Sequence, residues 1–276
     1  MDFFIRGPMS TAKNHLTVAL TFDFDAESGM IALGHQNNPA MISRGQYGAY
    51  VGVERLLKLY QKYQLPATAY IPGFTIKKYP DQCKKIRDTG IEIGHHGCIH
   101  EMPDSKNPEE QKEIIESGLE AMERILNIKP QGYRAPFLKQ NQTTYELLSH
   151  YGFDYDSSEC RQEYPYYIQC KEKELVEIPT QLEWNDTPLY FDFSTSSLFP
   201  IAHDPKVIEQ IWCDEFTGMY EDDNKACYVH VVHPFCTGHS YRMKIYERFI
   251  QFILQHPNVE FLTVNEICQR FKNNTL

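Results

Sequence analysis

Two histidines four residues apart, His96 and His100 in the segment GHHGCIHE, are the residues of this sequence best suited to metal chemistry. Upstream, the strand-like segment TFDFDAE carries two carboxylates, Asp23 and Asp25. Neutral imidazoles and a carboxylate are typical ligands of a catalytic zinc ion, at about 2.0 to 2.2 Å, and such a site keeps one position for water. Two histidines and one aspartate therefore predict a metal site with an open position.

The two carboxylates have a geometric relation that supports this prediction. In an extended segment alternate side chains face the same side, so Asp23 and Asp25 can enter one pocket while Phe24 packs elsewhere. Two carboxylates in one pocket repel each other unless a bound metal or an arginine lies beside them. Each motif alone has a plainer interpretation, because DxD often ends a strand in solvent and HxxxH is more often two unrelated histidines. His95 is expected to face away from His96.

Two further residues stand at the ends of predicted strands. Arg134, in GYRAP, could orient a carboxylate through a bidentate hydrogen bond, and Pro136 stiffens the chain after it. In HVVHP, His230 and His233 face opposite sides of a strand, so only one of them should reach the pocket. His233 lies at the end of the strand and is the better candidate.

These residues are positioned by alternating strand-like and helix-like segments. LTVALTF from Leu16 and ATAYI from Ala67 are typical of strands, and VERLLKLYQKY from Val53 is typical of a helix. Asn107 and Glu110 predict a capping box for a helix that ends near residue 127. Repeated βα units, seven or eight in under 280 residues, predict a closed or nearly closed α/β barrel whose functional groups follow the strands.

Composition limits the class of protein. The chain has 276 residues, 42% of them hydrophobic, which suits one large domain. Its net charge of −10 argues against a nucleic-acid partner. Only three consecutive apolar residues follow Asp2, and no later run reaches membrane-spanning length, so we expect a cytoplasmic protein with no membrane partner. Eight cysteines without a CxxC pair suggest reduced, buried thiols.

The motifs TFDFDAE, GHHGCIHE, GYRAP and HVVHP, in this order, resemble those of the polysaccharide deacetylase family, also called the NodB homology domain or carbohydrate esterase family 4. The segments ISRGQYGAYVGVERLLKLYQKYQLPATAYIPGF and EIPTQLEWNDTP resemble its branch of unsecreted peptidoglycan deacetylases, cyclic imide hydrolases and allantoinase-like proteins. The resemblance implies a single-domain, distorted (β/α)7 barrel over residues 16–276, preceded by an N-terminal extension, residues 1–15.

The resemblance also implies roles for individual residues. They are the general base at Asp23, the metal ligands at Asp25, His96 and His100, the arginine that orients the base at Arg134, and the general acid at His233. Asp186 is a carboxylate that could support the general acid. The sequence departs from the family where Phe24 separates the usual adjacent aspartates, so the division of base and ligand between Asp23 and Asp25 stays open. The ligands suit zinc, and also cobalt, nickel or iron.

The function implied is hydrolysis of a non-peptide amide bond by metal-activated water, with a carbohydrate or small molecule as partner. The first hypothesis is deacetylation of N-acetylated amino sugars. The second is hydrolysis of small cyclic imides or ureides, which a narrow, lidded pocket would favour; the segments Gly29–Tyr50 and Ser157–Lys173 are long enough to form a lid. The third is a catalytically silent barrel that binds a sugar or a protein. The resemblance also implies a homo-oligomer, commonly a tetramer.

Overall fold

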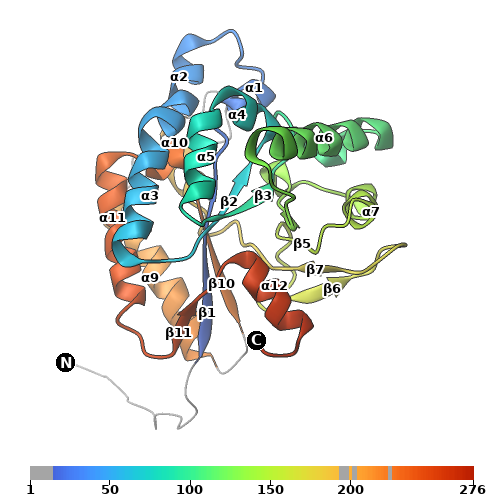
Figure 1. The fold of residues 1–276 in the computed structure, drawn as a ribbon. Coiled ribbons are helices and arrows are strands. Elements are labelled where there is room, and N and C mark those ends of the chain that lie inside the picture. The colour runs from blue at the N-terminus through green and yellow to red at the C-terminus, as the bar shows by residue number, and fades with distance from the viewer. Residues whose placement is uncertain (1–14, 193–198, 201–203, 223–225) are drawn as a thin grey trace, which may run out of the picture.

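A curled, mostly parallel sheet of nine strands forms the centre of the computed structural model, which describes residues 15–192, 199–200, 204–222 and 226–276 (Figure 1). The strand order is β10-β1-β2-β3-β4-β5-β7-β6, and β11 also pairs with β1. The strands are β1 (Leu16–Asp23), β2 (Thr68–Ile71), β3 (Glu92–His95), β4 (Gly132–Tyr133), β5 (Tyr155–Asp156), β6 (Tyr166–Ile168), β7 (Leu175–Glu177), β8 (Phe191–Asp192), β9 (Phe199–Pro200), β10 (Cys227–Val232) and β11 (Val259–Phe261). The predicted N-terminal extension falls almost wholly outside the described residues, so the predicted domain limits stay a prediction.

Helices cover the outside of the sheet (Figure 1). They are α1 (Ser28–Ala32), α2 (Pro39–Tyr47), α3 (Val53–Tyr63), α4 (Gly73–Lys78), α5 (Pro80–Asp88), α6 (Pro108–Ala121), α7 (Gln142–His150), α8 (Asp186–Tyr190), α9 (Pro205–Glu221), α10 (Pro234–Thr237), α11 (Ser240–Ile253) and α12 (Val264–Lys272). Short turns of other helix types are η1 (Gly48–Gly52), η2 (Pro103–Ser105), η3 (Met122–Leu126) and η4 (Pro136–Leu138). The predicted capping box of Asn107 and Glu110 begins α6, and η3 continues that helix to Asn127, as expected.

The register of the parallel strands brings their carboxyl ends to one edge. β1 is buried along its whole length, and its residues Thr17 to Phe22 pair with Cys227 to Val232 of β10. Across the sheet, Ile71 of β2 pairs with His95 of β3, which pairs with Tyr133 of β4. The residues that follow these strands therefore start from neighbouring positions.

The barrel is distorted because the sheet does not close by regular strand pairing between β10 and the β7–β6 edge. Side-chain and loop hydrogen bonds bridge the two edges: Cys227 N donates to Glu163 O at 2.8 Å, and Trp184 Nε1 donates to Val229 O at 3.1 Å. β6 runs antiparallel to β7, and β8 pairs antiparallel with β9. A distorted α/β barrel is thus confirmed, although simple βα repetition does not predict the two antiparallel pairs.

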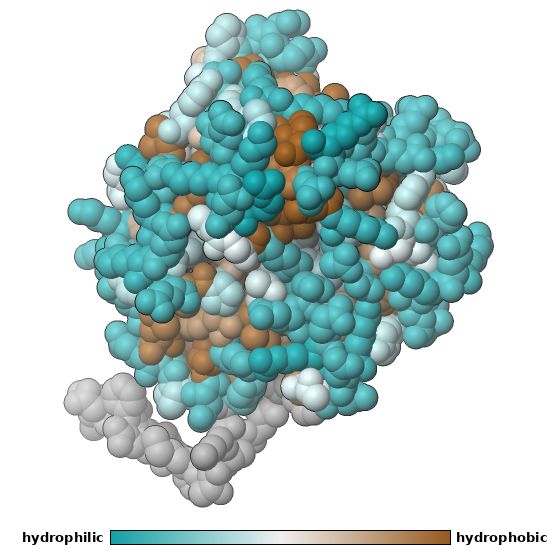
Figure 2. Space-filling model, in the orientation of Figure 1, coloured by the Kyte–Doolittle hydropathy of each residue, from teal (hydrophilic) through white to brown (hydrophobic). Residues whose placement is uncertain are grey.

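The outer surface is largely polar. The face seen in Figure 2 is mostly hydrophilic, with apolar side chains exposed in smaller patches. All eight cysteines are free, as predicted, but only Cys83, Cys227, Cys236 and Cys268 are buried, and Cys160 is exposed. In the part of the chain that the structure describes, no helix combines the length and apolar character that membrane crossing requires.

Candidate active site

Asp23 and Asp25 face the same cavity, and Phe24 between them packs in the hydrophobic core. Asp23 is the last residue of β1, and Phe24 N donates to Tyr70 O at 2.8 Å, which continues the strand-like geometry by one residue. Thr75 Oγ1 donates to the backbone oxygen of Asp25 at 2.7 Å. The alternation expected from the sequence therefore persists just beyond the strand and places two buried carboxylates together.

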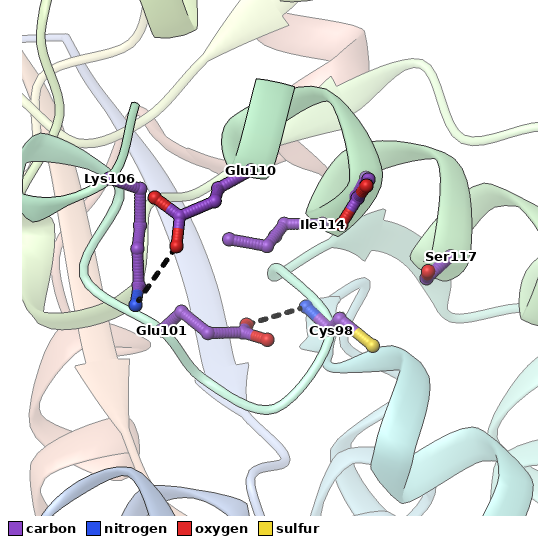
Figure 3. Close-up of a pocket in the computed structure, with 7 residues that line it drawn as sticks. Cys98, Glu101, Lys106, Glu110, Ile114 and Ser117 are labelled. Atoms are coloured by element: carbon purple, nitrogen blue, oxygen red, sulfur yellow. Dashed lines mark hydrogen bonds and ion pairs between the residues drawn. The ribbon is translucent and has the colours of Figure 1, made fainter. Parts of the chain in front are cut away.

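His96 and His100 of GHHGCIHE lie on an irregular loop after β3, not on a helix. Gly97 has a φ of 71° and His100 a φ of 61°, both in the left-handed region. The Glu101 carboxylate holds the loop by accepting from Cys98 N at 3.1 Å and Ile99 N at 2.7 Å. Figure 3 shows this carboxylate pointing at the Cys98 nitrogen. Both residues line a hollow of about 260 Å³. Sequence reasoning missed this function of Glu101.

Asp25, His96 and His100 form the one cluster in the described residues with the composition and spacing of a metal site, and their potential ligand atoms all lie within 4.8 Å of one another. His96 Nε2 lies 3.5 Å from Asp25 Oδ1, and His100 Nε2 lies 3.5 Å from Asp25 Oδ2. Tetrahedral ligands about 2.0 to 2.1 Å from an ion would lie about 3.3 Å apart. Both histidine–carboxylate distances are therefore close to the spacing that a divalent ion requires.

Hydrogen bonding also leaves ligand atoms of this cluster available. His96 Nδ1 bonds to the backbone oxygen of Arg134 at 2.7 Å, so its Nε2 faces the cluster. Neither His96 Nε2 nor Asp25 Oδ1 has a hydrogen-bond partner among the described residues, although both are buried. Buried polar atoms without partners are costly, and a bound cation would satisfy both. The residues therefore fit a metal ion.

The charges of the cluster support the same interpretation. Burial, with the Asp23 and Asp186 carboxylates, raises the pKa of Asp25 to about 7. Burial lowers the pKa of His96 to about 4 and that of His100 well below its ordinary value. The histidines are thus neutral, which is the form that binds metals, while the Asp25 carboxylate lacks a full compensating charge.

Asp23 has a different partner. Arg134 Nη1 donates to Asp23 Oδ1 at 2.8 Å, and the guanidinium is fully buried over the Tyr70 ring. Burial favours a raised pKa for Asp23, but Arg134, together with His96 and His233, lowers it below the ordinary value. Asp23 is therefore an ionised carboxylate beside the candidate metal ligands.

Small polar groups fix the position of the Arg134 guanidinium. Its nitrogens donate to Thr21 Oγ1 at 2.9 Å, to the backbone oxygen of Ser157 at 3.0 Å and to Thr180 Oγ1 at 3.3 Å. These positioning residues come from β1 and from the segments after β5 and β7. Sequence reasoning missed them, because an isolated serine or threonine at a strand end carries no signal.

His233 is the histidine of HVVHP that reaches the site. Its Nδ1 pairs with Asp186 Oδ1 at 2.7 Å, and its Nε2 lies 3.7 Å from Asp23 Oδ2 and 3.8 Å from Asp25 Oδ2. The suggested support from Asp186 is confirmed as a contact, and Thr237 Oγ1 holds the other Asp186 oxygen at 2.6 Å. Burial alone would lower the pKa of His233, but Asp186, Asp23 and Asp25 raise it to about 9.

The other two histidines of these motifs have structural roles. His95 Nε2 bonds to Ile115 O at 3.1 Å, on the helix side of the sheet, as expected. His230 stacks against Tyr246 and meets the edge of Trp212 in the core. The structure thus brings together all six predicted site residues. The neighbouring histidines His95 and His230 point away from the site.

A cavity of about 560 Å³ opens onto these residues. Besides the polar site, its walls are mostly apolar; the lining residues include Met30, Leu33, Met102, Phe137, Leu138, Leu182, Pro188, Phe191 and Phe235. The segment Gly29–Tyr50, expected as a lid loop, is largely the helices α1, α2 and η1, and α1 contributes directly to the wall. No described residue of Ser157–Lys173 lines this cavity, so that lid expectation was wrong.

Comparison with known proteins is consistent with this site. The family profile of the polysaccharide deacetylases matches residues 11–155. A peptidoglycan deacetylase from Helicobacter pylori is 32% identical, over 93% of this chain and 96% of its own. A peptidoglycan deacetylase-like protein from Gibberella zeae is 26% identical, over 94% and 87%.

Solved structures share the whole fold. A Mycobacterium smegmatis protein assigned to the polysaccharide deacetylases is 30% identical and superposes with a TM-score of 0.88, over 97% of this chain and 93% of its own. An allantoinase superposes with a TM-score of 0.82 over 99% and 96%, at 18% identity. At that identity the second likeness shows the fold alone.

Proposed function

The chain belongs to the polysaccharide deacetylase family and is an enzyme of the deacetylase type, and we propose that it removes the acetyl group from N-acetylated amino sugars in a metal-dependent reaction. The observation that carries the proposal is the buried cluster of Asp25, His96 and His100 beside two oriented pairs, Asp23 with Arg134 and His233 with Asp186. Together these groups supply a cation site, a proton acceptor and a proton donor.

Asp25, His96 and His100 would hold the divalent ion. When bound, it would polarise the amide carbonyl and acidify a water molecule. We propose zinc first, because two imidazoles and one carboxylate suit it, with cobalt, nickel and iron as alternatives.

Asp23 serves as the general base in this proposal. Its lowered pKa keeps it ionised at neutral pH, so it can accept a proton from the attacking water. Arg134 occupies Oδ1 and leaves Oδ2 directed toward His96 and His233, at 3.8 and 3.7 Å. This arrangement supports Asp25 as a metal ligand and Asp23 as the base, despite the intervening Phe24.

His233 serves as the general acid. Because Asp186 accepts from Nδ1 and raises the pKa, the imidazole carries a second proton on Nε2, which faces the cavity. Nε2 can therefore protonate the departing amine after the tetrahedral species forms. Asp186 acts through His233 and is a positioning residue.

A second candidate function is hydrolysis of small cyclic imides or ureides. The cavity favours it, because apolar walls close around the polar groups where a polymer would need an extended polar groove. The same base and acid could open a ring C–N bond. A cytoplasmic location and a tetrameric assembly stay predictions.

The test is metal content together with hydrolysis of a panel: an N-acetylglucosamine oligomer, succinimide and allantoin. Metal-dependent acetate release that is lost in His96→Ala would support the proposal, and imide turnover without acetate would support the second candidate. His150→Ala is the matched control, because His150 is exposed and pairs with Glu172, outside the site. A protein that binds no metal and turns over none of these substrates would contradict both candidate functions.

A further inference from the structure

Three consecutive residues after Pro136 line the cavity: Phe137, Leu138 and Lys139. An extended chain would send the middle one to the opposite side, so this arrangement requires an unusual backbone. Phe137 and Leu138 have φ values of 55° and 54°, in the left-handed region that non-glycine residues rarely adopt. Leu138 N donates to Ala135 O at 2.9 Å and Lys139 N to Pro136 O at 3.2 Å, which anchors the turn.

Backbone of this kind is concentrated at the cavity. Eight described non-glycine residues have positive φ, and four of them line the cavity: Ala26, His100, Phe137 and Leu138. Gln64 and Asn127, by contrast, only end helices. Such conformations are energetically costly and persist where the surroundings impose them, often at ligand sites. The turn at residues 137–139 is therefore held in a specific conformation as one wall of the cavity.

The chemistry of this wall is amphipathic. Phe137 packs against the His100 ring, with centroids 4.4 Å apart, so the apolar part of the wall touches the metal cluster. Lys139 is the one lysine or arginine among the described lining residues. It is exposed, and its amine makes no hydrogen bond or ion pair with the part of the chain that the structure describes. The acids of the cavity, Asp23 and Asp25, instead face Arg134 and the histidines.

We propose that this turn selects substrates with an anionic substituent: Lys139 pairs with a carboxylate of the substrate while Phe137 and Leu138 contact its apolar part. The inference rests on the proposed deacetylase function and names its substrate class. Among N-acetylated amino sugars, this chemistry favours one that bears a carboxylate over a neutral one. Lys139 is the one lysine or arginine among the described lining residues, so within this wall it is the group that can attract an anionic substituent.

The test uses N-acetylmuramic acid and its methyl ester, which differ by one charge. Their affinities for the zinc-loaded protein are measured by calorimetry. We expect the acid to bind about 3- to 10-fold more tightly, as one charge-assisted contact at a partly exposed site would give, and the difference to shrink at high salt. Lys139→Arg should keep the preference, Lys139→Met should abolish it and Lys139→Glu should reverse it.

Lys244→Met is the matched control, because Lys244 is also exposed without an ion pair but does not line the cavity. Equal binding of acid and ester by the wild type, or a preference that survives Lys139→Met, would overturn the inference. Acetate release from both probes, measured in the same samples, separates the two proposals. Release without discrimination leaves the deacetylase function intact, whereas discrimination without release from any amino sugar contradicts that function and leaves Lys139 as an anion-selecting residue.

Discussion

Two groups of buried acids lie at the carboxyl ends of the strands, and they are compensated in different ways. In the active-site group, Asp23 and Asp186 face Arg134 and His233 directly. In a second group, which we call the acid pair, Asp156 and Glu177 are the last residues of β5 and β7, are buried, and have no ion pair in the described residues. The carboxylates of both groups are buried, so the two groups differ in the partners that compensate their charges.

The acid pair is held by neutral donors. Glu177 Oε1 accepts from the backbone nitrogens of Ser158 and Glu159, both at 2.9 Å, and Asp156 accepts from Ser158 Oγ at 2.9 Å and Gln140 Nε2 at 3.0 Å. Glu177 Oε2 has no donor among the described residues, and the adjacent Asp156 carboxyl can pair with it only through a shared proton. Burial accordingly raises the pKa of Asp156 to about 6 and that of Glu177 well above its ordinary value.

The comparison shows that a shifted pKa alone does not mark a catalytic group. In the acid pair, one shared proton and neutral hydrogen-bond donors satisfy the carboxyl oxygens. The active-site group has cationic partners and, at Asp25 and His96, buried atoms with no hydrogen-bond partner among the described residues. Unsatisfied ligand atoms that converge on a cavity distinguish the functional group from the structural one.

The largest expected effect comes from removing a ligand atom. His96→Ala should abolish stoichiometric metal binding and reduce kcat/KM for deacetylation by about 10³-fold or more, because the chemistry of the bound ion is lost. Metal analysis after dialysis and acetate release measure the two effects. Glu177→Gln, in the acid pair, is the contrast and should leave both unchanged. If Glu177→Gln also lost metal, the division between the two groups would be wrong.

Removing the proposed base should separate binding from turnover. Asp23→Asn keeps the shape and a partner for Arg134 but cannot accept a proton at neutral pH. We expect kcat to fall about 10²- to 10⁴-fold while metal content stays at the wild-type level. Isothermal titration with zinc and steady-state kinetics measure the two quantities. Retention of wild-type turnover would exclude Asp23 as the base.

Asp186→Asn should change the pH profile of the reaction. A general acid works only while protonated, so activity is lost as pH rises through its pKa. Because Asp186 contributes most to raising the pKa of His233 to about 9, ahead of Asp23 and Asp25, its loss should move the alkaline limb of kcat/KM downward, toward the ordinary histidine value of about 6.5. The loss of activity should therefore be greater at pH 8 than at pH 6. An unmoved alkaline limb would show that another group donates the proton.

The sequence predicted the site where its geometry is local. Asp23 and Asp25 are related by strand alternation, and His233 by its place at the end of β10, so short-range rules suffice. The contacts of Arg134 with Thr21 and Thr180 join segments far apart in the chain, and no local pattern encodes them. Thr21 and Thr180 hold Arg134 because the sheet places them beside it, and threonine as a residue type does not reveal this.

The error about the segment Gly29–Tyr50 has a different cause. The segment Gly29–Tyr50 was interpreted as a loop, yet Asn38 caps α2 and Pro39 occupies its first turn, a local signal that was overlooked. The strands that carry the acid pair were expected from their sequences, FDYDSS and LVEIP. Their pairing in register, Asp156 with Glu177, depends on sheet topology and could not be predicted from the segments alone.

The smallest expected effect concerns the stability of the acid pair. Because the folded state raises the pKa of both carboxyls, it retains a proton that the unfolded chain releases above about pH 4, so this contribution to stability falls as pH rises through about 6. Glu177→Gln keeps the Oε1 acceptor and offers Asp156 a permanent amide donor. The free energy of unfolding of the variant relative to the wild type should therefore increase by about 1 to 2 kcal/mol between pH 5 and pH 7.5. Urea unfolding at the two pH values measures it, and a pH-independent difference would show that the pair does not share a proton.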